Sequence, residues 1–205
     1  MSRKTVGVVD YGVGNHTSVQ NTIRALGYRC HISSDYDFLR NADTLILPGV
    51  GAYPSAMAAL EAHGLSEFLK GLAVDGKPLI GICLGMQLLG DLSVEHGITR
   101  GLGLIPGEVH PIKEGCWHIG WNSLELIKSD NLMSCSDNEI FYFNHSYYLK
   151  TPNKYCVATV RLVGQPQLPA AVRQGNICGL QFHPEKSQNA GRRLLKSLID
   201  GLGGA

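Results

Sequence analysis

The sequence contains no apolar run that approaches the about 20 residues needed to cross a bilayer. Near its start, the apolar run Val6–Val9 is too short for the core of a signal peptide and is followed at once by Asp10. Long blocks of Lys or Arg are also missing, and the formal net charge is only +1. We therefore expect a cytoplasmic protein with no membrane partner and no nucleic-acid partner.

Cysteine pairs with the spacing of a metal site or a redox motif are missing as well. The six cysteines are scattered, and only Cys116 and His118 could supply two neighbouring metal ligands, with no second pair to complete them. Gly12 and Gly14 begin a dinucleotide-binding pattern, but Thr17 occupies the position of its third glycine. The sequence predicts a reducing compartment, no metal and no cofactor.

No repeat, low-complexity segment or linker divides the 205 residues, of which 44% are hydrophobic. Such a chain can bury a sizeable core, so we expect one domain over residues 1–205. Its first half alternates apolar runs with helical patterns, which is the rhythm of β-α-β units. Strands are predicted over 6–9, 28–32, 44–47 and 79–82, and helical segments over 17–26 and 55–72.

Residues 107–172 read differently, as short strands separated by turn signals. Strands are predicted over 141–143, 156–160 and 170–173, and an amphipathic helix runs through 192–199 near the end. This pattern indicates an antiparallel portion added to a parallel sheet. We predict an α/β fold with an open, mixed and mostly parallel sheet flanked by helices.

The segment Gly81-Ile82-Cys83-Leu84-Gly85 carries the strongest functional signal. An apolar strand leads into it and a helical pattern leads out, so Cys83 is placed on a tight strand-to-helix corner. The glycines allow unusual backbone angles and close approaches, and the start of the next helix favours a thiolate over a thiol. Both features indicate a nucleophile elbow, although a buried structural cysteine in a glycine-rich turn is the alternative.

A base and a carboxylate follow a second predicted strand about a hundred residues later. The buried run 177–182 ends in His183-Pro184-Glu185. Two residues apart in an extended chain, His183 and Glu185 leave the same face, so the carboxylate can orient the imidazole. Functional groups gather outside the carboxyl ends of parallel strands, so Cys83 and His183 are expected to meet there.

Read together, Gly81 to Gln87 and Gln181 to Ser187 resemble the triad class of glutamine amidotransferases. Four further motifs resemble the glutaminase subunits of imidazole glycerol phosphate synthases, in the same order and across nearly the whole chain. These motifs are Asp10 to Asn15, Leu47 to Gly51, His118 to Asn122 and Phe143 to Tyr147. The joint occurrence of six ordered motifs is far more specific than any one of them.

The resemblance implies a class I glutamine amidotransferase-like fold and glutamine hydrolysis at a Cys83, His183 and Glu185 triad. It also implies an obligate synthase or cyclase partner, forming a heterodimer, that receives the ammonia. The backbone N–H groups of Leu84 and of Val50 or Gly51 would form the oxyanion hole, on a loop that the loaded partner gates. Glutamine would be bound by Gln87, Glu95, His145, Ser146 and Tyr147. The partner face would contain Asn15, Tyr142 and Lys186, whereas Trp121 is expected to be structural.

Three alternatives compete with this prediction. A paralogous amidotransferase could supply ammonia to another synthase, such as one that modifies a surface-polysaccharide sugar. Gly115-Cys116-Trp117 departs from the basic residue and the proline that are expected just before His118 in the biosynthetic subunits, so this segment leaves the identity of the partner open. A serine-hydrolase-like enzyme would have its acid before the histidine, and here Glu185 follows His183. A catalytically silent binding module would lack a triad member, and none is missing.

Overall fold

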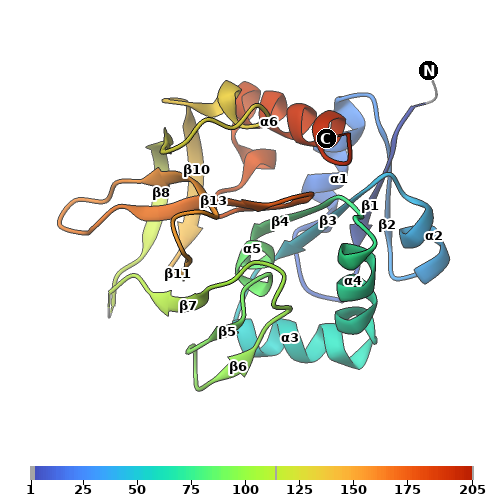
Figure 1. Cartoon of the computed structure of the whole chain (residues 1–205), viewed down its shortest axis with the longest axis horizontal. Helices are drawn as coiled ribbons and strands as arrows, with labels where there is room; N and C mark the ends of the chain where they lie inside the picture. The colour runs from blue at the N-terminus through green and yellow to red at the C-terminus, as the bar shows by residue number, and fades with distance from the viewer. Residues whose placement is uncertain (1–2, 114, 205) are drawn as a thin grey trace.

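A sheet of eight strands forms the centre of the protein in the computed structural model, which describes residues 3–113 and 115–204 (Figure 1). Its strands follow the order β2-β1-β3-β4-β14-β13-β12-β9. They are β1 (Thr5–Val9), β2 (Arg29–Ser33), β3 (Thr44–Gly49), β4 (Leu79–Cys83), β9 (Glu125–Leu126), β12 (Cys156–Val160), β13 (Leu168–Gln174) and β14 (Ile177–Leu180). The first five in this order are parallel, and the last three pair antiparallel. The predicted mixed, mostly parallel sheet is confirmed.

Helices cover both faces of this sheet, and each face has its own core (Figure 1). Helices α1 (His16–Ala25) and α6 (Gln188–Gly201) bury their apolar stripes on one face, together with sheet residues such as Val8. On the other face lie α2 (Tyr36–Asn41), α3 (Tyr53–Ala62) and α4 (Leu65–Val74). A sheet buried on both faces explains why its parallel strands read as continuous apolar runs.

The prediction of one helical segment over 55–72 is wrong in one respect. The structure divides it into α3 and α4 at Gly64, whose φ of +64° is left-handed. Glycine adopts this conformation without a Cβ penalty and ends α3, because an α-helix cannot continue through it. Helix α2 was not predicted; the carboxylate of Asp35 caps it by accepting a hydrogen bond from the Phe38 N–H at 2.7 Å.

Two smaller sheets lie beside the antiparallel end of the main sheet. One pairs β8 (His118–Ser123) with β10 (Ile140–His145), and the other has the order β11-β7-β5-β6. The latter contains β5 (Leu92–Ser93), β6 (Thr99–Arg100), β7 (Glu108–Pro111) and β11 (Tyr147–Lys150). The remaining elements are α5 (Leu84–Leu88) and the 3-10 turns Ser134–Ser136 and Pro184–Lys186. None of the described helices is long and apolar enough to cross a membrane.

The corner between β4 and α5 depends on close backbone contact with β3. A Cβ on Gly85 would overlap the carbonyl oxygen of Leu47, and a Cβ on Gly81 would lie 2.6 Å from the carbonyl oxygen of Gly85. These are backbone neighbours, so they cannot rotate away as a flexible side chain could. The two glycines therefore allow α5 to turn back tightly against the sheet directly after Cys83.

We expect Gly85→Ala to lower the free energy of unfolding by at least about 2 kcal/mol, because the added methyl group must displace a strand. Gly71→Ala is the matched control: Gly71 lies in α4 and has open space around its Cα. There, alanine should stabilise the helix by up to about 1 kcal/mol. Urea unfolding measures both. Equal effects of the two variants would contradict the close approach at Gly85.

Candidate active site

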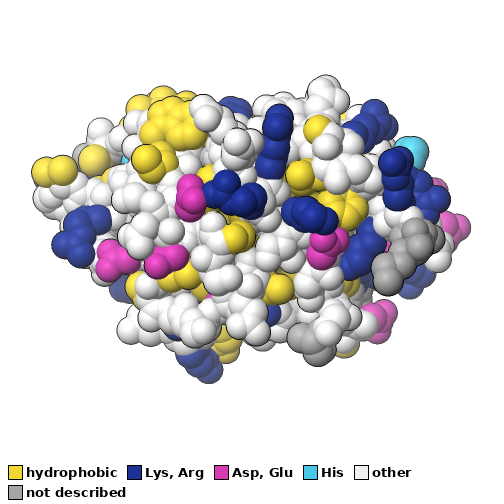
Figure 2. Space-filling view, turned by 90° about the horizontal axis from the view of Figure 1, so that it is seen from above, with side chains coloured by type: hydrophobic (Ala, Val, Ile, Leu, Met, Phe, Trp, Pro, Cys, Tyr) yellow, Lys and Arg dark blue, Asp and Glu magenta, His cyan; other side chains and the backbone are white. Residues whose placement is uncertain are grey.

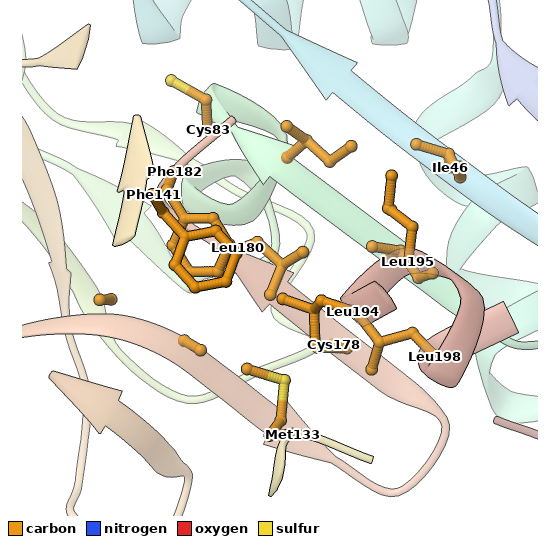
Figure 3. Packing of buried hydrophobic residues seen from close by; sticks show 14 of the residues in the cluster. Ile46, Cys83, Met133, Phe141, Cys178, Leu180, Phe182, Leu194, Leu195 and Leu198 are labelled. Carbon is orange, nitrogen blue, oxygen red and sulfur yellow. The ribbon is translucent and has the colours of Figure 1, made fainter. Parts of the chain in front are cut away.

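Cys83 lies at the corner between β4 and α5 in a strained backbone conformation. Its φ of +55° and ψ of −112° are rare for a residue with a side chain. Figure 3 shows its sulfur pointing away from the packed rings of Phe141 and Phe182. The strand-to-helix corner is therefore confirmed, but the unusual angle belongs to Cys83 itself, whereas Gly81 and Gly85 provide the close approach. Such strain at a nucleophile is typical of an elbow that presents a side chain to a ligand.

His183 reaches the same edge of the sheet because β14 lies parallel to β4, with Leu180 opposite Ile82. Its Nδ1 lies 2.9 Å from Oε1 of Glu185, and the two side chains are only 5% and 1% exposed. The prediction of an extended chain through Glu185 is wrong. Pro184 begins a 3-10 turn after the strand has ended, and this turn, not strand alternation, brings the carboxylate back to the imidazole.

The electrostatics of His183 follow from its two neighbours. Burial by itself would lower the pKa of His183, but hydrogen bonds to Cys83 and Glu185, together with the charges of both, raise it to about 9. At neutral pH the ring is therefore a cation beside Cys83 and Glu185. Oε1 of Glu185 faces the ring, and its buried Oε2 has no hydrogen-bond partner among the residues that the structure describes.

The other buried cysteines have a different chemistry. Burial raises the pKa of Cys30 and of Cys156 to about 11, and that of Cys178 to about 12. These groups are thiols at neutral pH and are poor nucleophiles. Among the residues that the structure describes, no group of three or more His, Cys, Asp or Glu side chains is placed to hold a metal ion.

A cavity of about 310 Å³ opens at the carboxyl edge of the sheet in front of Cys83 and His183. Most of the residues predicted for the site line it. They are Val50, Gly51, Cys83, Leu84, Gln87, Glu95, His145, Ser146, Tyr147, His183 and Lys186, joined by Trp117 and Asn144. Its volume suits a small metabolite rather than a macromolecule.

The predicted residues outside the cavity lie behind it or beside it. Glu185 is behind His183, and Asn15 is exposed where α1 begins. Tyr142 is half-buried on the outer side of β10, with the Lys186 ammonium 5.6 Å from its ring centre. Trp121, expected to be structural, is 52% exposed beside Tyr142, so it does not fill the core.

Val50 and Gly51 form a loop directly after β3, and Val50 is 41% exposed. The hydroxyl of Tyr11 donates to the carbonyl oxygen of Pro48 at 2.7 Å and so fixes the loop at its start. Burial raises the pKa of this phenol, which therefore remains a donor. Gly51 has a φ of +90°, a conformation that glycine adopts freely.

Two of the predicted glutamine-binding side chains present acceptors to the cavity. Gln87 uses its Nε2 to donate to the carbonyl oxygen of Tyr147 at 2.9 Å and to Oε1 of Gln181 at 3.1 Å, which leaves its own Oε1 as the amide atom for a ligand. Oε2 of Glu95 accepts from the Tyr53 N–H at 2.8 Å. An amide oxygen and a carboxylate together suit an ammonium group. His145, in contrast, uses both ring nitrogens within the protein.

Sequence reasoning missed three residues near the sulfur. The carbonyl oxygen of Asn144 lies 3.8 Å from Sγ of Cys83, and the Trp117 indole donates to the Asn144 side chain at 2.9 Å. The amide of Gln181 is fully buried with its nitrogen 4.0 Å from the same sulfur. A glutamine inside an apolar strand was the available signal, because a buried amide requires polar partners.

Comparisons with known proteins agree with this geometry. The family model of class-I glutamine amidotransferases matches residues 7–200. Imidazole glycerol phosphate synthase subunit HisH of Listeria monocytogenes is 44% identical over 193 residues, covering 92% of each chain. HisH of Methanothermobacter thermautotrophicus is 44% identical over 197 residues, covering 95% of this chain and 98% of its own.

A solved structure, PurLQS from Thermotoga maritima, shares the fold with a TM-score of 0.77 at 20% identity, covering 97% of this chain and 99% of that chain. The structure thus has the class I amidotransferase architecture that the sequence predicts. Because the family model spans residues 7–200 and the HisH relatives match over nine-tenths of the chain, the chain belongs to the class-I glutamine amidotransferase family, among the HisH-type subunits.

Proposed function

We propose that the chain is a glutaminase subunit that hydrolyses glutamine to glutamate and ammonia and delivers the ammonia to a separate cyclase subunit. The cyclase would use it to form imidazole glycerol phosphate and an aminoimidazole carboxamide ribotide in histidine biosynthesis. The observation that carries the proposal is that Cys83 and His183 line one cavity of metabolite size, with Nδ1 of His183 2.9 Å from the Glu185 carboxylate. The 44% identity to HisH subunits supports the pathway.

The first chemical step uses the proton that His183 holds. The Cys83 thiolate attacks the side-chain carboxamide carbon of glutamine, and the carbonyl oxygen becomes an oxyanion. His183 then gives its proton to the departing nitrogen, so ammonia leaves and a glutamyl thioester remains. Glu185 holds the ring in place and stabilises its charge. A raised pKa suits this role, because the ring stays protonated until the leaving group needs the proton.

The second step restores the enzyme. Neutral His183 takes a proton from a water molecule, and the resulting hydroxide attacks the thioester carbon. The carbon–sulfur bond breaks, glutamate leaves, and the thiolate and imidazolium are regenerated. The oxyanion in both steps is held by the N–H of Leu84 and of Val50 or Gly51. Donors of this kind contribute about 2.7–4 kcal/mol each when aimed at the developing charge.

Glutamine recognition follows from the polar lining of the cavity. Its α-ammonium group would lie against Oε1 of Gln87 and the Glu95 carboxylate, which present acceptors there. The Ser146–Tyr147 backbone lines the same wall, next to the ring of His145. Trp117 borders the mouth of the cavity. A proline is expected at this position in the biosynthetic subunits.

The partner would dock on the outer side of the β8–β10 sheet, next to the cavity. Large apolar side chains are exposed there: Trp117 by 67%, Ile119 by 62%, Trp121 by 52% and Ile140 by 55%. Exposed apolar patches beside a polar rim mark protein interfaces. Lys186, Tyr142 and Asn15 would lie at its edge.

On the face seen in Figure 2, Lys and Arg side chains are interspersed with Asp and Glu, without a continuous basic stripe for a nucleic acid.

Three further features belong to the same proposal: one domain over residues 1–205, a cytoplasmic location, and gating of the Val50–Gly51 loop by the loaded cyclase. A free chain that hydrolyses glutamine as fast as the complex with the loaded cyclase would contradict the gating. The two rival partners are separated by genetics, because only a histidine-pathway subunit restores growth to a histidine auxotroph that lacks its own glutaminase subunit.

Cys83→Ala tests the chemistry in the reconstituted complex with the cyclase. Glutamine-dependent turnover should fall below detection, since Cys83 is the one cysteine among the described residues that line the cavity, whereas turnover with added ammonium salts should stay at the wild-type rate. Product formation is followed with each nitrogen source. Loss of both activities would mean that Cys83 supports folding or assembly, and retained glutamine use would exclude it as the nucleophile.

Ile119→Asp tests the docking face against a matched control, Ile98→Asp, because Ile98 is also an exposed isoleucine, at 79%, but lies between β5 and β6. A buried charge in the interface should weaken binding of the cyclase by about 2 kcal/mol or more, about thirtyfold in Kd. The control should bind within about twofold of wild type. Titration calorimetry measures both, and equal affinities of the two variants would exclude this face.

A further inference from the structure

Two buried histidines lie beside the triad and take no part in the proposed chemistry. His118 of β8 and His145 of β10 face each other across the antiparallel pair, and Nδ1 of His118 lies 2.9 Å from Nε2 of His145. They are 7% and 6% exposed. The ring of His118 also stacks on Phe143 with a centroid distance of 4.4 Å. The two rings are therefore fixed both by packing and by a hydrogen bond.

The hydrogen-bond partners determine where the ring protons are. Nδ1 of His145 lies 2.8 Å from the carbonyl oxygen of Tyr147, and a carbonyl can only accept, so Nδ1 carries the hydrogen. Nε2 of a neutral His145 is then an acceptor. It follows that His118 donates to it through Nδ1–H. Both rings are assigned to the same Nδ1–H tautomer.

The surroundings keep this pair neutral, in contrast to His183. Burial lowers the pKa of His118 to about 4. Burial also lowers the pKa of His145 to about 3, against the opposing hydrogen bond to Tyr147 and with additional repulsion from His118 and His183. The titratable groups that act on His145 are thus other histidines. One imidazolium and two neutral imidazoles lie within one small region.

The Tyr147 carbonyl connects this pair to the active site. It accepts a second hydrogen bond, from Nε2 of Gln87, and the same nitrogen also donates to Oε1 of Gln181. These bonds fix both amide orientations. Oε1 of Gln87 is left for a ligand in the cavity, and Nε2 of Gln181 is directed at the Cys83 sulfur at 4.0 Å. The chain of donors runs from β8 to the nucleophile.

We propose that His118 and His145 are positioning residues for glutamine turnover: as a neutral pair they hold the Tyr147 carbonyl, and through it the amides of Gln87 and Gln181. The inference rests on the proposed glutaminase function. Without the His118 donor, Nε2 of His145 becomes a buried acceptor without a partner, which costs free energy. This cost destabilises the Nδ1–H tautomer of His145 relative to the Nε2–H tautomer. The Tyr147 carbonyl then loses one of its two donors, and the acceptor of Gln87 is no longer fixed toward the ligand.

Two variants of nearly equal size test this in the complex with the cyclase. In His118→Asn, the side-chain nitrogen occupies the place of Nδ1 and keeps the donor, whereas His118→Leu has the same shape and no donor. We expect His118→Leu to raise KM for glutamine about tenfold with a smaller change in kcat. His118→Asn should keep KM within about threefold of wild type. A packing role alone would affect both variants alike, and equal KM values would overturn the proposal.

A second measurement is independent of turnover. Nitrogen-15 NMR of the histidine rings reports which ring nitrogen carries hydrogen, and we expect neutral Nδ1–H tautomers for both His118 and His145 at pH 7. A protonated ring, or an Nε2–H tautomer at His145, would overturn the proposal. If the wild-type complex did not hydrolyse glutamine, the proposed function would fail, while the tautomers would still be readable from these spectra.

Discussion

The site depends on one arrangement: the His183 ring lies 2.9 Å from the Glu185 carboxylate and lines the same cavity as Cys83. Burial by itself would lower the pKa of this ring, but the hydrogen bonds and charges of Cys83 and Glu185 outweigh it, so that the pKa rises to about 9. The contribution of this raised pKa to the free energy of unfolding is greatest below about pH 6.5, where the ring would be protonated in the unfolded chain too. It is lost as the pH rises through about 9. A proton held on the ring beside the Cys83 sulfur suits the cleavage of an amide.

The surrounding fold serves to hold these three groups together. Parallel pairing of β4 with β14 brings Cys83 and His183 to one edge of the sheet, although a hundred residues separate them. Two cores, one on each face, fix that edge, and the close approach of α5 at Gly85 allows the strained corner at Cys83. Polar groups buried around the cavity, among them Gln87 and Gln181, hydrogen-bond to one another, and we propose that they orient the ligand. Their hydrogen bonds extend to the Cys83 sulfur, through Gln181, and to the cavity lining, through Gln87.

Sequence reasoning reached the sheet and the corner because each leaves a local pattern: apolar runs, and glycines beside a cysteine. A histidine next to a carboxylate is the pattern from which it proposed the triad. It missed what depends on pairing across strands. The contact of His118 with His145 follows from the register of β8 on β10, which no local pattern contains. The turn at Pro184 and the break at Gly64 each depend on one residue's backbone angles. The exposure of Trp121 depends on which side of a two-stranded sheet remains uncovered.

The most direct test is an NMR titration of the His183 ring in the full chain and in Cys83→Ser. The account predicts that wild-type His183 stays protonated through neutral pH and loses its proton near pH 9. In Cys83→Ser its pKa should fall, because the ring then loses the contribution of Cys83 that helps to raise it. A wild-type ring that titrates near 6.5, or one that is unaffected by the loss of the sulfur, would contradict the account.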